Sequence, residues 1–306
     1  MTEFLSRTRT ARRTYGFDEI ALVPASATVD PLDVDLSWSV GPHRFALPFI
    51  ASAMDSVVDP RVAVTLSHLG ALGVLNLEGL QTRYEDPEEP LEQIAASAPE
   101  DVVRVMQRLY QQPVQDDLVA SRIKAIIDGG AIAAVSVTPA AASRLLPVAE
   151  RAGAHLIVLQ STVVTARHHS SRGRSVGIPD LIAQAEAPVM IGNCVGYDAA
   201  MLGSALARAE EAPGRGFHWG MATPHAALPR GTRVKVTRTG TLEQILLGPA
   251  ATDDGSQNLA EALRTAMGMC GARTIAEMHG AELIIAPTLA SEGKGLQFSQ
   301  KVGQGR

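Results

Sequence analysis

Small and polar residues stand where several apolar segments of this sequence end. The segment "PFIASAM" (48–54) ends with Ser52 and Met54, and "AAMLGSALA" (199–207) contains Gly203 and Ser204. Small residues let backbone N–H groups approach a ligand closely, and a Gly-Ser pair at the end of a strand suits a phosphate group. Each pair alone is weak evidence, but three further segments end in the same way, and the recurrence predicts one ligand site built from several strand ends. These further ends are Asn76, Gln160-Ser161-Thr162 and Gly192-Asn193.

The apolar segments alternate with helix-like segments, which predicts βαβ units. Asp59-Pro60 begins "DPRVAVTLSHLG", whose apolar spacing and final Gly70 are typical of a helix. Residues 81–128 are polar, acidic and helix-prone. Five strand and helix units in succession predict an α/β fold and favour a (β/α)8 TIM barrel over an open sheet. The expected strands are residues 48–54, 71–79, 131–139, 154–162 and 187–194, with "AAMLGSALA" as a further strand.

The pattern along the chain predicts a single catalytic domain over residues 1–306. Its expected parts are an N-terminal arm of short mixed segments (1–47), the barrel strands (48–208), a short flap region (209–240), and a C-terminal helix and tail (241–306). In the last part, "SQNLAEALRTAMGMCGARTIAEMHG" (256–280) indicates one helix followed by the tail.

Composition limits the class of protein. The 306 residues are 46% hydrophobic and 19% charged, and the net charge of −5 argues against a nucleic-acid-binding surface. We find no apolar run of 18 residues and no apolar core of a signal peptide near the start, so we expect a cytoplasmic protein without a membrane segment. Cys194 and Cys270 are too far apart in the sequence to form a metal-binding motif, so we expect no metal cluster. Two cysteines are also too few for a disulfide framework.

Several motifs together resemble the IMP dehydrogenase/GMP reductase family. "TYGFDEIALVP" (14–24) is similar to its N-terminal signature, and "LPFIASAMDSVVDPRVAVTLSHLGALGVLN" (47–76) to its first strand, helix and second strand. "VMIGNCV", "AMLGSALARAEEAPGRG" and "LAEALRTAMGMCGARTIAEM" follow in the family's order. "RGFHWGMATP" and "LPRGTRVKV" are most similar to a bacterial branch that lacks the regulatory CBS pair. The resemblance implies a (β/α)8 barrel without a CBS domain that acts on purine nucleotides.

The resemblance also implies roles for residues of the predicted site. Ser52 and Met54 line the nucleotide pocket, and Asn193 faces the ligand near the centre of hydride transfer. Backbone N–H groups of Gly203 and Ser204 bind the 5′-phosphate. The remaining implied contacts are Gly220 and Met221 beside the purine, and Gln160, Ser161 and Thr162 toward the cofactor.

Four positions depart from the family pattern and leave cofactor choice and base recognition open. Asn76-Leu77-Glu78 stands where the family usually has His or Lys. Gln160 replaces an Asp expected to hold the nicotinamide ribose, and His218 replaces a Tyr that reaches the phosphate. Arg230 replaces the Gln or Glu that reads N1 of the purine.

One junction in the sequence is too short for a complete barrel. Only about four residues, Val195 to Asp198, separate the strand that ends at Gly192-Asn193 from the strand that ends at Gly203-Ser204, whereas parallel strands need a crossover of about a dozen residues. The family has roughly eighty residues here, including strands six and seven of the typical barrel of about 250 residues. Because barrel closure links strand number, tilt and shear, we interpret the junction as an omission of residues, with a deletion as the less favoured alternative.

The family's chemistry is covalent. A Cys thiolate attacks C2 of the nucleotide, and a hydride passes between C2 and NAD or NADPH. The loop with that Cys falls within the missing stretch, so the catalytic residues are unknown, and Cys194 fits a buried small residue better than a nucleophile.

Three functions stay open at this point. A GMP reductase, converting GMP and NADPH to IMP and NH3, is preferred because the segment after "WGMATP" is short and has no Arg-Tyr pair. The alternatives are an IMP dehydrogenase, converting IMP and NAD to XMP, and a nucleotide-binding relative without turnover. The resemblance further implies a homotetramer, and the tail "SEGKGLQF" resembles part of a K⁺ site.

Overall fold

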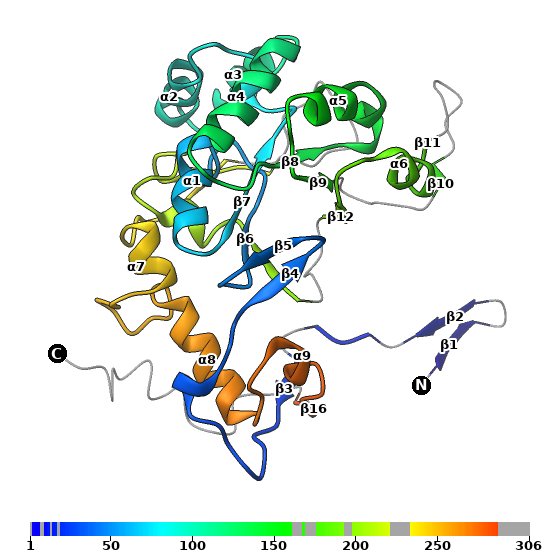
Figure 1. Ribbon diagram of the computed structural model, residues 1–306, viewed down its shortest axis with the longest axis vertical. Coiled ribbons are helices and arrows are strands. Elements are labelled where there is room, and N and C mark those ends of the chain that lie inside the picture. Colours follow the sequence, from blue (N-terminus) through cyan, green and yellow to red (C-terminus); the bar gives the residue numbers. More distant parts are fainter. Residues whose placement is uncertain are drawn as a thin grey trace. The chain divides into compact units, whose positions relative to one another are not determined.

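The computed structural model describes residues 2–6, 9–12, 14–16, 19–160, 167–168, 176–192, 198–220 and 233–286. The chain divides into two compact units, one formed by residues 1–35 with 261–306 and the other by residues 36–260. Each unit is described by itself below, and Figure 1 shows the elements coloured along the sequence.

A parallel sheet is the centre of the unit formed by residues 36–260. Its strand order is β12-β9-β8-β7-β6-β13, and every neighbouring pair is parallel. In this order the chain's last sheet strand, β13, pairs with its first, β6, as the eighth strand of a barrel pairs with the first. The strands are β6 (Phe49–Ala51), β7 (Leu72–Asn76), β8 (Ala134–Val137), β9 (Leu156–Leu159), β12 (Val189–Ile191) and β13 (Ala200–Leu202).

Helices follow the sheet strands, as the alternating pattern predicts. Asp59 caps the first helix by accepting a hydrogen bond from Val62 N at 2.7 Å, and Pro60 occupies its first position. Thr138 and Pro139 begin α5 in the same way. The α-helices of this unit are α1 (Pro60–His68), α2 (Glu88–Ala96), α3 (Val102–Leu109), α4 (Asp116–Asp128), α5 (Pro139–Arg151), α6 (Ile178–Gln184) and α7 (Leu242–Leu246).

An antiparallel hairpin packs against one end of the sheet's core. It consists of β4 (Trp38–Val40) and β5 (His43–Phe45), and the rings of Trp38 and Phe45 stack at 5.0 Å between centroids. Both rings belong to a buried cluster with Ile50, Leu72, Val74, Ala134, Leu156 and Val158, which come from four sheet strands. The hairpin at the end of the expected N-terminal arm therefore contributes to this core.

Shorter elements complete this unit. Single turns of 3-10 helix lie at Leu80–Thr82 and Leu206–Arg208. Two-residue ladders join β10 (Arg167–His168) to β11 (Val176–Gly177) and β14 (Phe217–His218) to β15 (Val234–Lys235).

The unit formed by the two chain ends is smaller. It contains the hairpin of β1 (Thr2–Ser6) and β2 (Arg9–Arg12), a 3-10 turn at Pro31–Asp33, and an antiparallel pair of β3 (Ile20–Leu22) and β16 (Leu283–Ile285). Most of α8 (Leu259–Met269) and all of α9 (Ile275–Met278) belong to it.

The single helix expected over 256–280 is wrong, because two helices stand there. Gly271 has a φ of +74° and ends α8. Ala272 N donates to Met267 O at 2.9 Å and Gly271 N to Gly268 O at 3.0 Å, the pattern of a Schellman cap. Thr274 then caps α9, with its side chain accepting from Glu277 N. The glycine in "MCGAR" is the signal for this break.

The environment of His155 predicts that its contribution to the stability of the sheet unit depends on pH. Its Nδ1 accepts a hydrogen bond from Ala133 N at 2.9 Å, and its ring lies 5.7 Å from that of His43. Burial, and then the nearby His43, lower the pKa of His155. Because the folded state resists protonation at this ring, the contribution of His155 to the unfolding free energy falls as pH drops below the ordinary histidine value of about 6.5.

Replacing this histidine tests that dependence. His155→Ala loses about 1 kcal/mol at pH 8 through the lost hydrogen bond. Between pH 7 and pH 5 its unfolding free energy changes more favourably than that of the parent, because the variant lacks this destabilising protonation. Urea unfolding at the three pH values measures both effects. His43→Ala removes only the smaller repulsive contribution and serves as the comparison; an unchanged pH slope in His155→Ala contradicts the interpretation.

Candidate active site

The predicted site residues of two neighbouring strands lie together in the structure. Ser52 N, just beyond β6, donates to Leu202 O of β13 at 2.8 Å. A Cβ placed on Gly203 would lie 3.2 Å from Met54 Sδ and 3.5 Å from Ser52 Oγ. Ser52, Met54 and Gly203 therefore face one another across the β6–β13 boundary, and the small residue at position 203 keeps the space between them open.

Ser204 contacts a histidine from a later part of the chain. Its Oγ lies 3.0 Å from His218 Nε2, and His218 is the second residue of β14. His218 Nδ1 is buried without a hydrogen-bond partner among the described residues. Burial lowers the pKa of His218, so the imidazole is neutral near pH 7. A neutral imidazole beside an exposed hydroxyl at a strand end can take up a proton when an anion approaches.

The polar residues at the next three strand ends bind one another. Glu78, after β7, accepts from Thr138 N at 2.6 Å and from Thr138 Oγ1 at 3.1 Å, and Asn76 Oδ1 accepts from Glu78 N at 2.9 Å. Gln160, after β9, is buried, and its Oε1 accepts from Ser136 Oγ at 2.9 Å. These contacts link neighbouring strand ends. They give Glu78 and Gln160, two of the residues that depart from the family pattern, defined partners within the protein.

A buried carboxyl group, Asp55, lies at the same end and follows Ser52 and Met54 among the strand-end residues that the sequence marks as candidate chemistry. Asp55 Oδ2 accepts from Tyr110 Oη at 2.6 Å and from Leu80 N at 2.8 Å, while Oδ1 is buried without a partner among the described residues. Burial raises the pKa of Asp55 to about 6, against the lowering effects of these hydrogen bonds and of Arg83. The signal in the sequence is an Asp inside the apolar stretch "ASAMDSVV", since buried carboxyl groups need partners.

Some predicted residues lie outside the described part of the chain. They are Asn193, Met221, Ser161, Thr162 and Arg230, together with Cys194. Gly220 is described and exposed, directly after the buried Trp219. Cys270 is a free, half-buried thiol after α8.

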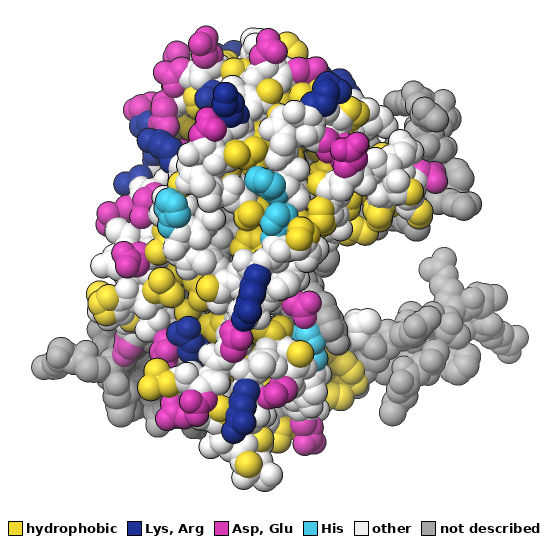
Figure 2. All heavy atoms as spheres, viewed as in Figure 1, with side chains coloured by type: hydrophobic (Ala, Val, Ile, Leu, Met, Phe, Trp, Pro, Cys, Tyr) yellow, Lys and Arg dark blue, Asp and Glu magenta, His cyan; other side chains and the backbone are white. Residues whose placement is uncertain are grey.

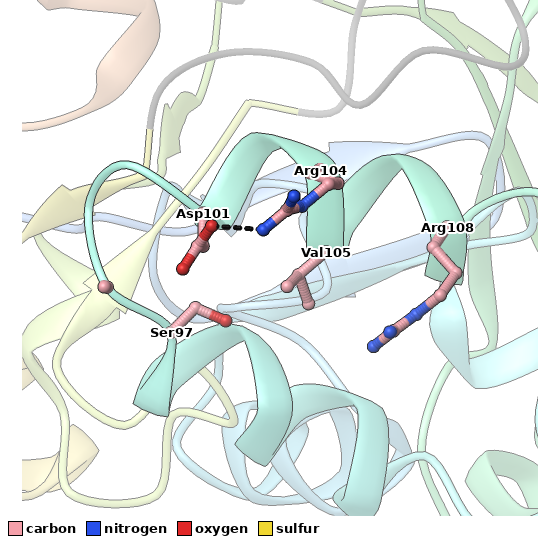
Figure 3. Close-up of a pocket in the computed structure, with 6 residues that line it drawn as sticks. Ser97, Asp101, Arg104, Val105 and Arg108 are labelled. Atoms are coloured by element: carbon pink, nitrogen blue, oxygen red, sulfur yellow. Dashed lines mark hydrogen bonds and ion pairs between the residues drawn. The ribbon is translucent and has the colours of Figure 1, made fainter.

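A hollow on the α2–α3 hairpin is lined by none of the predicted strand-end residues. It has a volume of about 420 Å³ and lies between α2 and α3, where Asp101 and Arg104 pair at 2.5 Å (Figure 3). Its lining residues are Ser97, Ala98, Asp101, Arg104, Val105 and Arg108. Because Arg104 is already paired and Arg108 donates to Gln93 Oε1 at 2.8 Å, the hollow offers little free positive charge.

The described surface and titratable residues bear on nucleic-acid, metal and membrane binding. Figure 2 shows acidic and basic side chains interspersed on the visible face, without one large patch of a single sign. Within the described residues, no group of three or more His, Cys, Asp or Glu side chains is arranged to hold a metal ion. No described helix combines the length and apolar character needed to cross a membrane.

Comparisons with known proteins agree with this arrangement. The sequence model of the IMP dehydrogenase/GMP reductase domain matches residues 14–162. An oxidoreductase of Mycolicibacterium smegmatis is 30% identical over 352 aligned positions, which cover 86% of this chain and 94% of the relative. The inosine-5′-monophosphate dehydrogenase of Methanocaldococcus jannaschii is 32% identical over 120 residues, or 39% of this chain and 23% of that protein.

A solved structure is similar over nearly the whole chain. The IMP dehydrogenase/GMP reductase-like protein of Corynebacterium glutamicum superposes with a TM-score of 0.85 and 26% identity, covering 93% of this chain and 97% of that one. The mycobacterial alignment also bears on the short junction. Since 86% of 306 residues is about 263, about 90 of its 352 positions have no counterpart in this chain, a number similar to the roughly eighty residues that the family resemblance implies at the junction.

Proposed function

This chain belongs to the IMP dehydrogenase/GMP reductase family of NAD(P)-dependent oxidoreductases, and on that premise we propose that it binds a purine 5′-monophosphate at its strand ends and acts as a GMP reductase. In that reaction GMP gives up its 2-amino group as ammonia and C2 gains a hydride, so that IMP forms. A bound nicotinamide cofactor would supply this hydride, and a proton is consumed as ammonia is released. NADPH is the expected cofactor, with NAD as the alternative.

The observation that carries nucleotide binding is the cluster of Gly203, Ser204 and His218 at the end of β13. Gly203 leaves room beside Ser52 and Met54, and Ser204 Oγ is held 3.0 Å from an imidazole nitrogen. Hydroxyl, imidazole and backbone N–H groups are donors suited to a phosphate. Ser52 and Met54, which lie beside Gly203, are the residues that we assign to the nucleoside.

The β14–β15 ladder favours the reductase over the dehydrogenase. Phe217 pairs with Lys235 and His218 with Val234, so residues 219–233 form a connection of fifteen residues fixed at both ends. The dehydrogenase reaction requires a hydrolytic Arg-Tyr pair on a long flap, and residues 219–233 contain no Tyr. A short connection is poorly suited to exchange places with a bound cofactor.

A second candidate function is nucleotide binding without turnover. Its support is the sheet itself, since six strands are described and only residues 192–199 connect β12 to β13. The family's nucleophilic Cys belongs to the segment that is absent at this junction, and Cys194 is the one cysteine between residues 192 and 199 of the sequence. The homotetramer, the K⁺ site and the cytoplasmic location stay predictions.

One set of assays separates these functions. Full-length protein is incubated with GMP and NADPH, and separately with IMP and NAD, while absorbance at the NAD(P)H band is followed and nucleotide binding is measured by calorimetry. Turnover of GMP supports the reductase, and turnover of IMP alone contradicts it. Binding without turnover supports the second candidate, and no binding contradicts both. Cys194→Ala identifies whether any turnover uses that thiol.

The phosphate contacts have their own prediction. Ser204→Ala weakens GMP and IMP binding about tenfold, the cost of one hydrogen bond to a charged group, while guanosine, which lacks the phosphate, is affected less than twofold. Calorimetry with the nucleotide and the nucleoside measures this difference. Equal losses for both ligands contradict a phosphate contact at Ser204.

The pH dependence of binding tests His218. Its lowered pKa leaves it neutral in the free protein at pH 8, and a bound phosphate dianion favours the imidazolium form. Nucleotide affinity therefore rises as pH falls from 8 to about 6.5, above the second phosphate pKa of about 6. His218→Phe flattens this dependence, and an equal slope in parent and variant contradicts the assignment.

A further inference from the structure

The β14–β15 ladder is held at both ends by one helical hairpin. This α2–α3 hairpin, residues 88–109, packs with Trp219 in a single buried cluster that includes Leu91, Ile94, Met106 and Leu109. Trp219 directly follows His218 of β14, and Arg233 directly precedes Val234 of β15. Anything that fixes Trp219 and Arg233 therefore also fixes His218.

Trp219 is joined to Asp55 through Tyr110. The indole N–H of Trp219 donates to Tyr110 Oη at 2.9 Å, and Tyr110 Oη donates to Asp55 Oδ2 at 2.6 Å. An indole nitrogen can only donate and an ionised carboxylate can only accept, so the hydroxyl between them has one orientation that satisfies both. Both Tyr110 and Trp219 are buried, and a lost hydrogen bond there leaves polar atoms without water.

Arg233 and Arg215 also bind the α2–α3 hairpin, through contacts with α2. Arg233 Nη1 donates to Ile94 O at 2.5 Å and to Ala95 O at 3.0 Å, near the C-terminus of α2, where a positive charge is favourable. Its guanidinium also lies 4.3 Å from the centre of the Phe217 ring. Arg215 pairs with Glu88 at 3.0 Å and Glu92 at 2.5 Å on α2.

We propose that Tyr110 is a positioning residue that, by joining Trp219 to Asp55, holds the β14–β15 ladder on the α2–α3 hairpin and keeps His218 beside Ser204. The inference rests on the proposed function, because it assigns the α2–α3 hairpin to the support of the phosphate site. The hydrogen bonds of the Tyr110 hydroxyl described here join it to Asp55 and Trp219. Its effect on binding passes through Trp219 and His218.

Tyr110→Phe tests the proposal, with Tyr84→Phe as the matched control. Tyr84 Oη donates to Leu109 O at 3.0 Å, so its removal costs the same helical hairpin a hydrogen bond without touching Trp219. Protein labelled with 5-fluorotryptophan gives two ¹⁹F resonances, from Trp38 and Trp219. We expect Tyr110→Phe to shift the Trp219 resonance toward its position in the unfolded chain and to leave that of Trp38 in place.

The effect on the phosphate site is measured in the same variants. In Tyr110→Phe the imidazole pKa of His218, followed by NMR, returns toward the ordinary histidine value, and GMP binding weakens about tenfold; Tyr84→Phe changes neither. Arg233→Ala releases the other end of the ladder and keeps the buried hydrogen bonds of Tyr110. We expect it to move the Trp219 resonance and the His218 pKa in the same direction as Tyr110→Phe does. It replaces Tyr110→Phe as the test if that variant does not fold. Unchanged Trp219 and His218 signals in both variants overturn the proposal. If the signals move but the parent binds no nucleotide, the positioning role stands and the proposed function fails.

Discussion

Gly214→Ala is expected to lower the unfolding free energy by about 3 kcal/mol. A Cβ at this position would lie 2.1 Å from Phe217 O, 2.6 Å from Ser56 Cβ and 2.7 Å from Ser56 O. Two of these three atoms belong to the backbone, so side-chain rotation cannot remove the overlap. The glycine is required here for space, since its φ lies outside the left-handed region.

The same backbone contacts explain why the overlap cannot relax. Gly214 N donates to Ser56 O at 3.0 Å, and Phe217 N donates to Gly214 O at 2.9 Å. Between them Arg215 and Gly216 have φ values of +52° and +89°, a tight turn that leads directly into β14. Moving this turn displaces His218, so the variant also loses nucleotide binding.

Urea unfolding measures the effect, with Gly203→Ala as the matched control. The nearest atom to a Cβ at Gly203 is the end of the flexible Met54 side chain, at 3.2 Å. We expect Gly203→Ala to stay within about 1 kcal/mol of the parent in stability. Equal stability of the two variants contradicts the argument from backbone contacts at Gly214.

The elements of the sheet unit could be predicted because their signals are local. Asp59-Pro60 and Thr138-Pro139 combine a capping side chain with a proline at the first helical position, and both begin helices. The strand ends at Ser52 and Gly203 are each marked by an apolar run that closes on small residues. That these two ends lie together follows from β6 pairing with β13, which the family resemblance implies.

The supporting contacts of the site could not be predicted in this way. Tyr110 and Asp55 are 55 residues apart, and Trp219 and Tyr110 are 109 residues apart. No periodicity or turn signal joins residues at such separations, and each of the three has an ordinary interpretation as a core residue. Ser204 and His218 are 14 residues apart, but their contact depends on the turn at Gly214–Phe217. The polar chemistry of the strand ends is therefore visible in the sequence, whereas its support depends on the tertiary structure.

Protonation of Asp55 is expected to contribute a rise in the unfolding free energy of the parent as pH falls from about 7 to about 4. The pKa of this carboxyl is raised from 3.8 to about 6 by burial. The folded state therefore binds the proton more tightly than the unfolded chain does. The stabilisation is fully present below the unfolded value of 3.8 and is lost as pH rises through about 6. A difference of this size corresponds to about 3 kcal/mol, opposite in sign to the effect of His155.

Asp55→Asn removes this dependence because an amide does not ionise. Its carbonyl oxygen can still accept from Tyr110 Oη and Leu80 N, but its NH2 group takes the place of Oδ1, which has no partner among the described residues. We expect an unfolding free energy at pH 7 close to the parent's and a much smaller gain at pH 5. Urea unfolding at pH 5, 6 and 7 measures it, and a parent-like slope in Asp55→Asn contradicts the assignment.

Tyr110→Phe gives the opposite change at the same carboxyl. The hydrogen bond from Tyr110 lowers the pKa of Asp55, so its removal raises that pKa further and moves the loss of stability to higher pH. Arg83 also favours the ionised form of Asp55, and its guanidinium lies 5.9 Å from the centre of the Tyr110 ring. The slope between pH 6 and 8 therefore becomes steeper in Tyr110→Phe and flatter in Asp55→Asn. Slopes that change in the same direction in the two variants would show that another group controls the stability of this site.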